Sequence, residues 1–141
     1  MVVDTMVFAY ALLGVEAYRE DALAILEQVD TISVPDSLRV EMANVLWQWI
    51  NHRKVAIETA FQVMDDTESL IGRTLSGKDL WERALMLSVE SNHPAYDTYF
   101  IAAAELDNTR VVSFDKKLKA VFPDKVLTAA EFLAPEARSP R

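Results

Sequence analysis

Short apolar segments alternate with longer helical segments along this chain, and this alternation constrains the fold more than any other feature. Short strands are expected in "MVVD", "TISVP", "TRVVS" and "KVLTAAEFL". The expected helices cover residues 5–13, 16–29, 36–54, 57–71, 76–92 and 95–108, and residues 72–77 are expected to form a loop. Because parallel strands need crossover helices, the pattern predicts an α/β fold. Its three α/β/α layers would hold a short parallel sheet flanked by helices.

The length of 141 residues suggests one domain, expected over residues 1–133, followed by a polar tail over 134–141 that is expected to be mobile. No apolar run approaches the length that a membrane span needs, and no basic segment precedes the first one, so neither a membrane segment nor a targeting segment is expected. The chain contains no cysteine, which excludes disulfides and thiolate metal sites and agrees with a cytoplasmic location.

The net charge of −8 argues against a general nucleic-acid binder, because such proteins normally carry a basic face. Two interpretations remain open at this point. The protein is either an ordinary acidic protein or one whose acids converge on a cation.

Four acids are expected at one edge of the sheet. Asp4 ends the first strand, Asp115 lies just beyond the "TRVVS" strand, and Glu41 and Asp97 lie in the first turns of helices. Sites in open parallel sheets form outside the carboxyl ends of the strands. Each acid alone is more often a helix cap or a partner of the helix dipole. Together they would repel one another unless a proton or a cation intervened, and an all-oxygen cluster suits Mg²⁺ or Mn²⁺ and phosphoryl chemistry.

The segments that carry these acids, "VVDT", "RVEMANVLW", "YDTYFIAAAE" and "VVSFDKKL", resemble those of PIN-domain ribonucleases, in particular VapC-type toxins of toxin–antitoxin pairs. The resemblance implies that Asp4, Asp97 and Asp115 hold Mg²⁺, with Glu41 helping directly or through water. It implies cleavage of RNA that leaves a 5′-phosphate and a 3′-hydroxyl. Thr5 and Ser113 would orient carboxylates or waters, and a local hydrogen bond to the backbone is the alternative for each hydroxyl.

The same resemblance implies an RNA substrate, an antitoxin on a separate chain and a homodimer. Two positions depart from the family pattern. Met6 stands where a small polar residue is common, and Thr98 where alanine is more usual.

Basic and aromatic residues leave further alternatives open. Lys116, Lys117 and Lys119 could contact RNA phosphates or form a solvated helix face. Trp47 and Trp49 point to opposite sides of one helix, so a neighbouring helix or a second subunit must cover Trp47 if Trp49 faces the core.

His52 and His93 are expected to be ordinary surface or capping residues, because no paired-histidine metal spacing is present. The sequence also lacks the signatures of a P-loop, a Rossmann cofactor site and a serine hydrolase. Two other functions are alternatives: a catalytically silent PIN fold that binds RNA or protein, and a phosphotransfer receiver. The receiver is disfavoured because "VVDT" offers one acid where a receiver needs a pair.

Overall fold

The structure of the chain, a computed structural model, describes residues 1–134 and contains a parallel five-stranded sheet with the order β3-β2-β1-β4-β5. All neighbouring strands run parallel, so every connection between them is a crossover. The strands are β1 (Val2–Val3), β2 (Ser33–Pro35), β3 (Arg73–Leu75), β4 (Val111–Val112) and β5 (Val126–Leu127).

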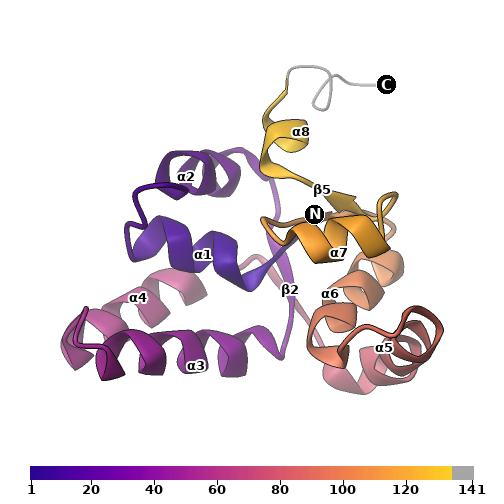
Figure 1. The fold of residues 1–141 in the computed structure, drawn as a ribbon, viewed down its shortest axis with the longest axis horizontal. Coiled ribbons are helices and arrows are strands. Elements are labelled where there is room, and N and C mark those ends of the chain that lie inside the picture. The colour runs from indigo at the N-terminus through magenta and orange to yellow at the C-terminus, as the bar shows by residue number, and fades with distance from the viewer. Residues whose placement is uncertain (135–141) are drawn as a thin grey trace.

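Helices lie on both sides of this sheet (Figure 1). On one side α1 contacts α2, α3 and α4, while on the other α6 packs against β1, β2 and β4 and carries α5 on its outer side. The helices are α1 (Thr5–Leu12), α2 (Arg19–Gln28), α3 (Leu38–Asn51), α4 (Ile57–Leu70), α5 (Gly77–Ser91), α6 (Ala95–Leu106), α7 (Lys116–Val121) and α8 (Ala129–Leu133). The predicted α/β fold with a short parallel sheet flanked by helices is therefore confirmed.

The core lies between the sheet and these helices. The residues of β1 and β4 are fully buried, and the alanine run of α6 lets that helix approach the strands closely. Phe8 and Phe100 are among the largest fully buried side chains and come from helices on the two sides of the sheet. Strands β1 and β4 have only two residues each, and both are buried. They thus fix the positions of the residues that follow them, Asp4 and Ser113.

Two sequence predictions were wrong. The segment predicted as a loop over residues 72–77 contains β3, which pairs with β2 in the register Val34 to Thr74. This edge strand has three residues and only Leu75 is buried, so it carries no apolar alternation to detect. The helix predicted from residue 16 begins at Arg19, with Tyr18 as its N-cap residue.

No helix among residues 1–134 is long and apolar enough to cross a membrane. Of the tail predicted over residues 134–141, only Ala134 lies within the described residues.

Candidate active site

Asp4 is held between two neighbouring strands by hydrogen bonds to both of its oxygens. It follows β1 directly and caps α1, where its Oδ1 accepts from the Thr5 backbone N–H at 2.8 Å. Its Oδ2 accepts from the Ser113 hydroxyl at 2.6 Å, and Ser113 follows β4, the strand that pairs with β1. The sheet register therefore sets the position of this carboxylate.

Thr5 also connects Asp4 to Glu41. Its hydroxyl donates to Glu41 Oε2 at 2.8 Å, while its backbone N–H donates to Asp4. Glu41 lies in the first turn of α3, which follows β2. The buried Thr5 side chain thus sets the spacing between an acid from β1 and an acid from α3.

Asp115 is both a helix cap and a residue of the cleft. Its Oδ1 accepts from the backbone N–H groups of Lys117 at 2.9 Å and Leu118 at 3.0 Å, so it is the N-cap of α7. Its own N–H donates to Ser113 Oγ at 2.9 Å. Among the described residues only Oδ1 takes part in these bonds. Asp115 therefore caps α7 and also lines the cleft, so its two interpretations from the sequence, helix cap and site residue, do not exclude one another.

Asp97, in the first turn of α6, is paired with His93. The Nε2 atom of His93 lies 2.8 Å from Asp97 Oδ2, and the His93 side chain is only 10% exposed. Sequence reasoning missed this pair and treated His93 as an ordinary surface or capping residue. The signal was the four-residue spacing between the histidine and the acid across the start of α6 at Pro94.

The four acids line one cleft of about 1210 Å³. Apolar and aromatic side chains make up much of the remaining lining of this cleft. They include Met6, Tyr10, Val40, Val45, Tyr96, Tyr99 and Phe114. The cleft therefore combines carboxylates at the carboxyl edge of the sheet with walls suited to flat or apolar groups.

The surroundings disfavour the charged forms of Asp4 and Glu41. Burial raises the pKa of Asp4 to about 6, against the opposing hydrogen bonds from Ser113 and Thr5, and the charges of Asp97 and Asp115 raise it further. Burial likewise raises the pKa of Glu41 to about 7, against the Thr5 hydrogen bond, with the charges of Asp4 and Asp97 adding to the effect. Asp97 and Asp115 thus repel the charged form of Asp4, and Asp4 and Asp97 repel that of Glu41, so a proton or cation would relieve the repulsion.

The family model of the PIN domain matches residues 1–122 of the chain. The chain belongs to the PIN-domain family. The family predicted from the four acidic segments is thereby confirmed. No curated protein matches the chain in sequence.

Solved structures agree with this assignment at the level of the fold. A protein from Pyrobaculum aerophilum is 17% identical, with a TM-score of 0.71 over 94% of this chain and 85% of its own. A toxin–antitoxin complex from Klebsiella pneumoniae gives 19% identity and a TM-score of 0.65, over 91% of this chain and 96% of its own. VapBC2 from Rickettsia felis, bound to a DNA fragment from its promoter, gives 14% identity and a TM-score of 0.66, over 90% of this chain and 96% of its own.

Residues 1–134 of this PIN domain contain no group of three acidic or histidine side chains arranged closely enough to hold a metal ion. The predicted approach of all four carboxylates to a single ion thus stays a prediction. The donor chemistry nevertheless fits a hard cation, since carboxylate oxygens with unfavourably buried charge gather in the cleft. Ser37 adds a buried hydroxyl to the lining that has no hydrogen-bond partner among the described residues.

That hydroxyl does not cap α3, although serine is a favoured N-cap residue. Ser37 occupies the N-cap position, but its side chain makes no capping bond. The neighbouring Asp36 instead accepts a hydrogen bond from the backbone N–H of Gly77, at the start of α5. Neither side chain therefore caps the first turn of α3, although both residue types favour capping.

The two departures from the family pattern have different surroundings in this PIN domain. Thr98 is fully buried, and its hydroxyl bonds the Ala84 carbonyl at 2.9 Å and the Ser88 hydroxyl at 2.7 Å, which ties α6 to α5. Met6 is half-buried and lines the cleft. Of the two, only Met6 can affect what the cleft accepts.

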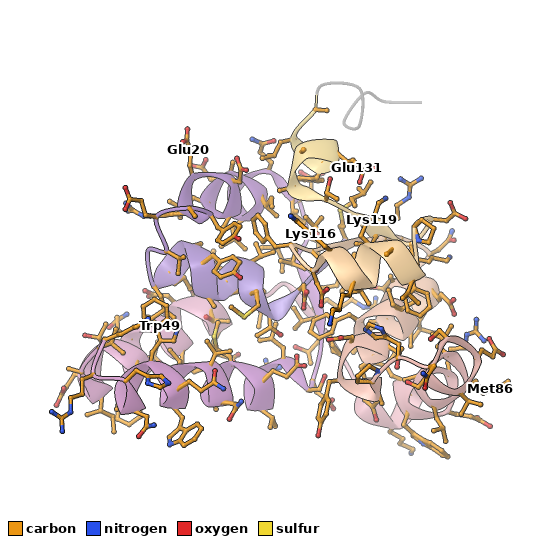
Figure 2. The ribbon with its side chains drawn as sticks, viewed as in Figure 1. Glu20, Trp49, Met86, Lys116, Lys119 and Glu131 are labelled. Carbon is orange, nitrogen blue, oxygen red and sulfur yellow. The ribbon has the colours of Figure 1, made fainter. Side chains whose placement is uncertain are left out.

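The three lysines after Asp115 do not form one set. Lys119 donates to the carbonyl oxygens of Pro123 and Val126 and pairs with Glu131 of α8 at 3.1 Å (Figure 2). Through these bonds Lys119 holds α7 against the C-terminal segment. Lys116 and Lys117 are exposed and make no side-chain hydrogen bond or ion pair within residues 1–134.

Proposed function

We propose that this protein is a Mg²⁺-dependent endoribonuclease of the VapC type, the toxin of a toxin–antitoxin pair. The observation that carries the proposal is the convergence of Asp4, Glu41, Asp97 and Asp115 on one cleft of a PIN domain. An acidic protein has no structural need to keep four mutually repelling carboxylates together. A cation that bridges them supplies the reason.

Asp4, Asp97 and Asp115 would hold Mg²⁺ or Mn²⁺, with Glu41 assisting directly or through water. The bound ion would supply a more acidic water molecule and neutralise charge on the RNA phosphodiester. Cleavage would leave a 5′-phosphate and a 3′-hydroxyl.

The chain's own residues would orient this site. Ser113 fixes one oxygen of Asp4, Thr5 fixes one oxygen of Glu41, and His93 fixes one oxygen of Asp97. Asp4 accepts hydrogen bonds at both oxygens, whereas Glu41 and Asp97 each accept one at a single oxygen. Such outer hydrogen bonds orient the ligands of metal sites. Lys116 and Lys117 would contact RNA phosphates next to Asp115.

Two protein partners belong to the proposal. An antitoxin on a separate chain is suggested by the similarity to structures described as a toxin–antitoxin complex and as VapBC2. A homodimer is suggested by large exposed apolar residues on α3 and α5. Among them Trp47 is 59% exposed, so no helix within the described residues covers it.

The decisive test compares Asp97→Asn with Asp65→Asn in the cleavage of a labelled RNA panel in Mg²⁺. Each change removes one negative charge at nearly constant size, but Asp65 is an exposed residue of α4 outside the cleft. We expect Asp97→Asn to lower the rate by about 100-fold or more with the fold intact, and Asp65→Asn to leave it unchanged.

EDTA is the control for contamination, since cleavage that survives both Asp97→Asn and EDTA comes from another nuclease. Failure of the wild type to cut any RNA in Mg²⁺ or Mn²⁺, without antitoxin, would contradict the proposal and favour the silent binding module.

A further inference from the structure

The three residues between α5 and α6 place the side chain of His93 against Asp97. Asn92 ends α5 in the left-handed conformation, with φ of 53°, and Pro94 is the N-cap residue of α6. A proline ring fixes its own φ and restricts the preceding residue to extended conformations. The backbone N–H of His93 in addition donates to the Ser88 carbonyl at 3.3 Å. The position of His93 is therefore set by the chain on both sides of it.

Pro94 also removes a common helix-end partner of Asp97. Asp97 is the third residue of α6, a position from which an acid can reach back to the backbone N–H of the N-cap residue. Helix α8 shows this arrangement, since Glu131 accepts from the backbone N–H of Thr128 at 3.1 Å. Proline has no backbone N–H, so Asp97 can make no such bond. Its Oδ2 lies 2.8 Å from His93 Nε2 instead.

The direction of this hydrogen bond follows from the chemistry of the two groups. An ionised carboxylate only accepts hydrogen bonds, so Nε2 of His93 must carry the proton that lies between them. The bond holds Oδ2 of Asp97, and no hydrogen bond within residues 1–134 reaches its Oδ1. Because Asp97 lines the cleft, this second oxygen is available to a ligand there.

His93 is also in contact with α7. The ring of Phe122, the C-cap residue of α7, meets the imidazole edge-to-face, with centroids 6.2 Å apart and planes inclined by 82°. The other end of the same helix is capped by Asp115, and Lys119 ties the helix to the segment that follows it. One short helix therefore carries Asp115 at its start and contacts the partner of Asp97 at its end.

We propose that His93 is a positioning residue, which orients the carboxylate of Asp97 toward the cation and is itself supported by Phe122 of α7. This inference rests on the proposed function and deepens it, because it assigns part of the geometry of the cleft to a side chain that holds no cation. A carboxylate that is already oriented loses less freedom when the cation binds. A merely structural pair would stabilise the fold without changing the affinity for a cation.

The test measures the affinity of the full chain for Mn²⁺ at pH 8, from the electron paramagnetic resonance signal of the free ion. His93→Gln places an amide donor where Nε2 lies, whereas His93→Asn is too short to do so. His93→Phe keeps a ring against Phe122 and removes the donor. His52→Phe is the matched control, because His52 is exposed and lies outside the cleft.

We expect His93→Phe and His93→Asn to weaken Mn²⁺ binding by about 10- to 100-fold, as the loss of an outer partner of a metal ligand typically does. His93→Gln and His52→Phe should retain the affinity of the wild type. Phe122→Leu, which removes the edge-to-face contact, should cause a smaller loss of about threefold. Wild-type affinity in His93→Phe would overturn the inference, as would an equal loss in His93→Gln and His93→Phe.

A double-mutant cycle shows whether His93 acts through Asp97. In the Asp97→Asn background, His93→Phe should have little further effect on Mn²⁺ affinity, because the carboxylate that His93 orients is absent. Equal effects in both backgrounds would overturn the inference. Nitrogen NMR of the metal-free wild type should find the imidazole proton on Nε2, and a proton on Nδ1 alone would also overturn it. Melting curves establish that each variant is folded, and His93→Asn replaces His93→Phe if the latter does not fold.

RNA cleavage separates this inference from the proposed function. If the wild type cuts RNA in Mg²⁺ but its affinity for Mn²⁺ does not depend on His93, the inference fails and the function stands. If the wild type cuts no RNA but His93 and Asp97 jointly determine Mn²⁺ affinity, the nuclease proposal fails and the positioning role stands. A wild type that binds no Mn²⁺ would overturn the inference.

Discussion

At the scale of single residues, the fold holds two carboxyl groups in surroundings that oppose their charge. The pKa of Asp4 is about 6 and that of Glu41 about 7, chiefly because both are buried. A carboxyl group whose charged form is destabilised by burial is more often functional than structural. The sequence predicted the acids because each follows a strand or opens a helix, and their convergence depends only on parallel topology. It did not predict His93, because that contact depends on the exact backbone path around Pro94.

The raised pKa values predict that the metal-free protein loses stability as pH rises from about 4 to about 7. A raised folded-state pKa means that the folded chain holds more protons than the unfolded chain in this window, so its free energy of unfolding falls with pH. For Asp4 the rise from 3.8 to about 6 corresponds to up to about 3 kcal/mol. Urea unfolding at pH 4.5 and pH 8 in EDTA measures the effect.

Asp4→Asn is the matched variant for this prediction. It should flatten the pH dependence and raise the free energy of unfolding at pH 8 relative to the wild type. Mg²⁺ at pH 8 should raise the melting temperature of the wild type and do so much less for Asp4→Asn. An unaltered pH slope in Asp4→Asn would show that other groups control it.

At the scale of elements, the sheet and helices were predictable where apolar periodicity was strong and not where it was absent. Strands β1 and β4 are recognisable because adjacent valines are buried on both faces. Strand β3 was missed because its side chains show no apolar alternation. Its backbone pairing with β2 defines it as a strand. The start of α2 was misplaced because Tyr18, its N-cap residue, makes no side-chain capping bond and instead stacks on Tyr10 of α1.

The contact between α5 and α6 gives a prediction at this scale. Thr98→Val keeps the shape of a fully buried side chain but removes the hydroxyl that bonds Ala84 and Ser88 on α5. Leaving the half-buried Ser88 hydroxyl without this partner should cost about 1 kcal/mol. Thr67→Val is the matched control, since Thr67 is equally buried but bonds only Val63 of its own helix.

Chemical denaturation of both variants measures the difference. Thr98→Val should lose more stability than Thr67→Val, and RNA cleavage should be unchanged because Thr98 does not line the cleft. Equal losses in the two variants would contradict a specific role of this hydroxyl in joining the helices.

At the scale of the whole molecule, the described surface carries apolar residues that one chain leaves uncovered. On α5 they are Trp81, Leu85, Met86 and Val89, each at least half exposed. Met86 projects from the outer side of this helix, while Trp49 lies on the side of α3 that faces α1 (Figure 2). The sequence predicted that the two tryptophans of α3 point apart, but it could not decide what covers Trp47, because that depends on a surface formed outside one chain.

The proposed homodimer predicts what a charge would do on this surface. Helices α3 and α5 lie along the same side of the molecule in Figure 1, so residues of both could meet a second copy. We expect the wild type to have twice the chain mass of 15.9 kDa in light scattering after size exclusion, and Trp47→Asp and Leu85→Asp to shift it toward the monomer. A buried unpaired charge in an apolar interface costs several kcal/mol, which is a large part of the affinity of a modest dimer.

Phe61→Asp controls for the added charge itself, because Phe61 is 64% exposed on α4, among the helices that contact α1. It should leave the mass unchanged. Melting curves must establish that each variant is folded, since an unfolded chain would also lose the dimer. A monomeric wild type at all concentrations would contradict the homodimer without affecting the acidic cleft, whose residues all come from one chain. The exposed apolar residues would then be available to the antitoxin, and its binding to Trp47→Asp and Leu85→Asp would be the next measurement.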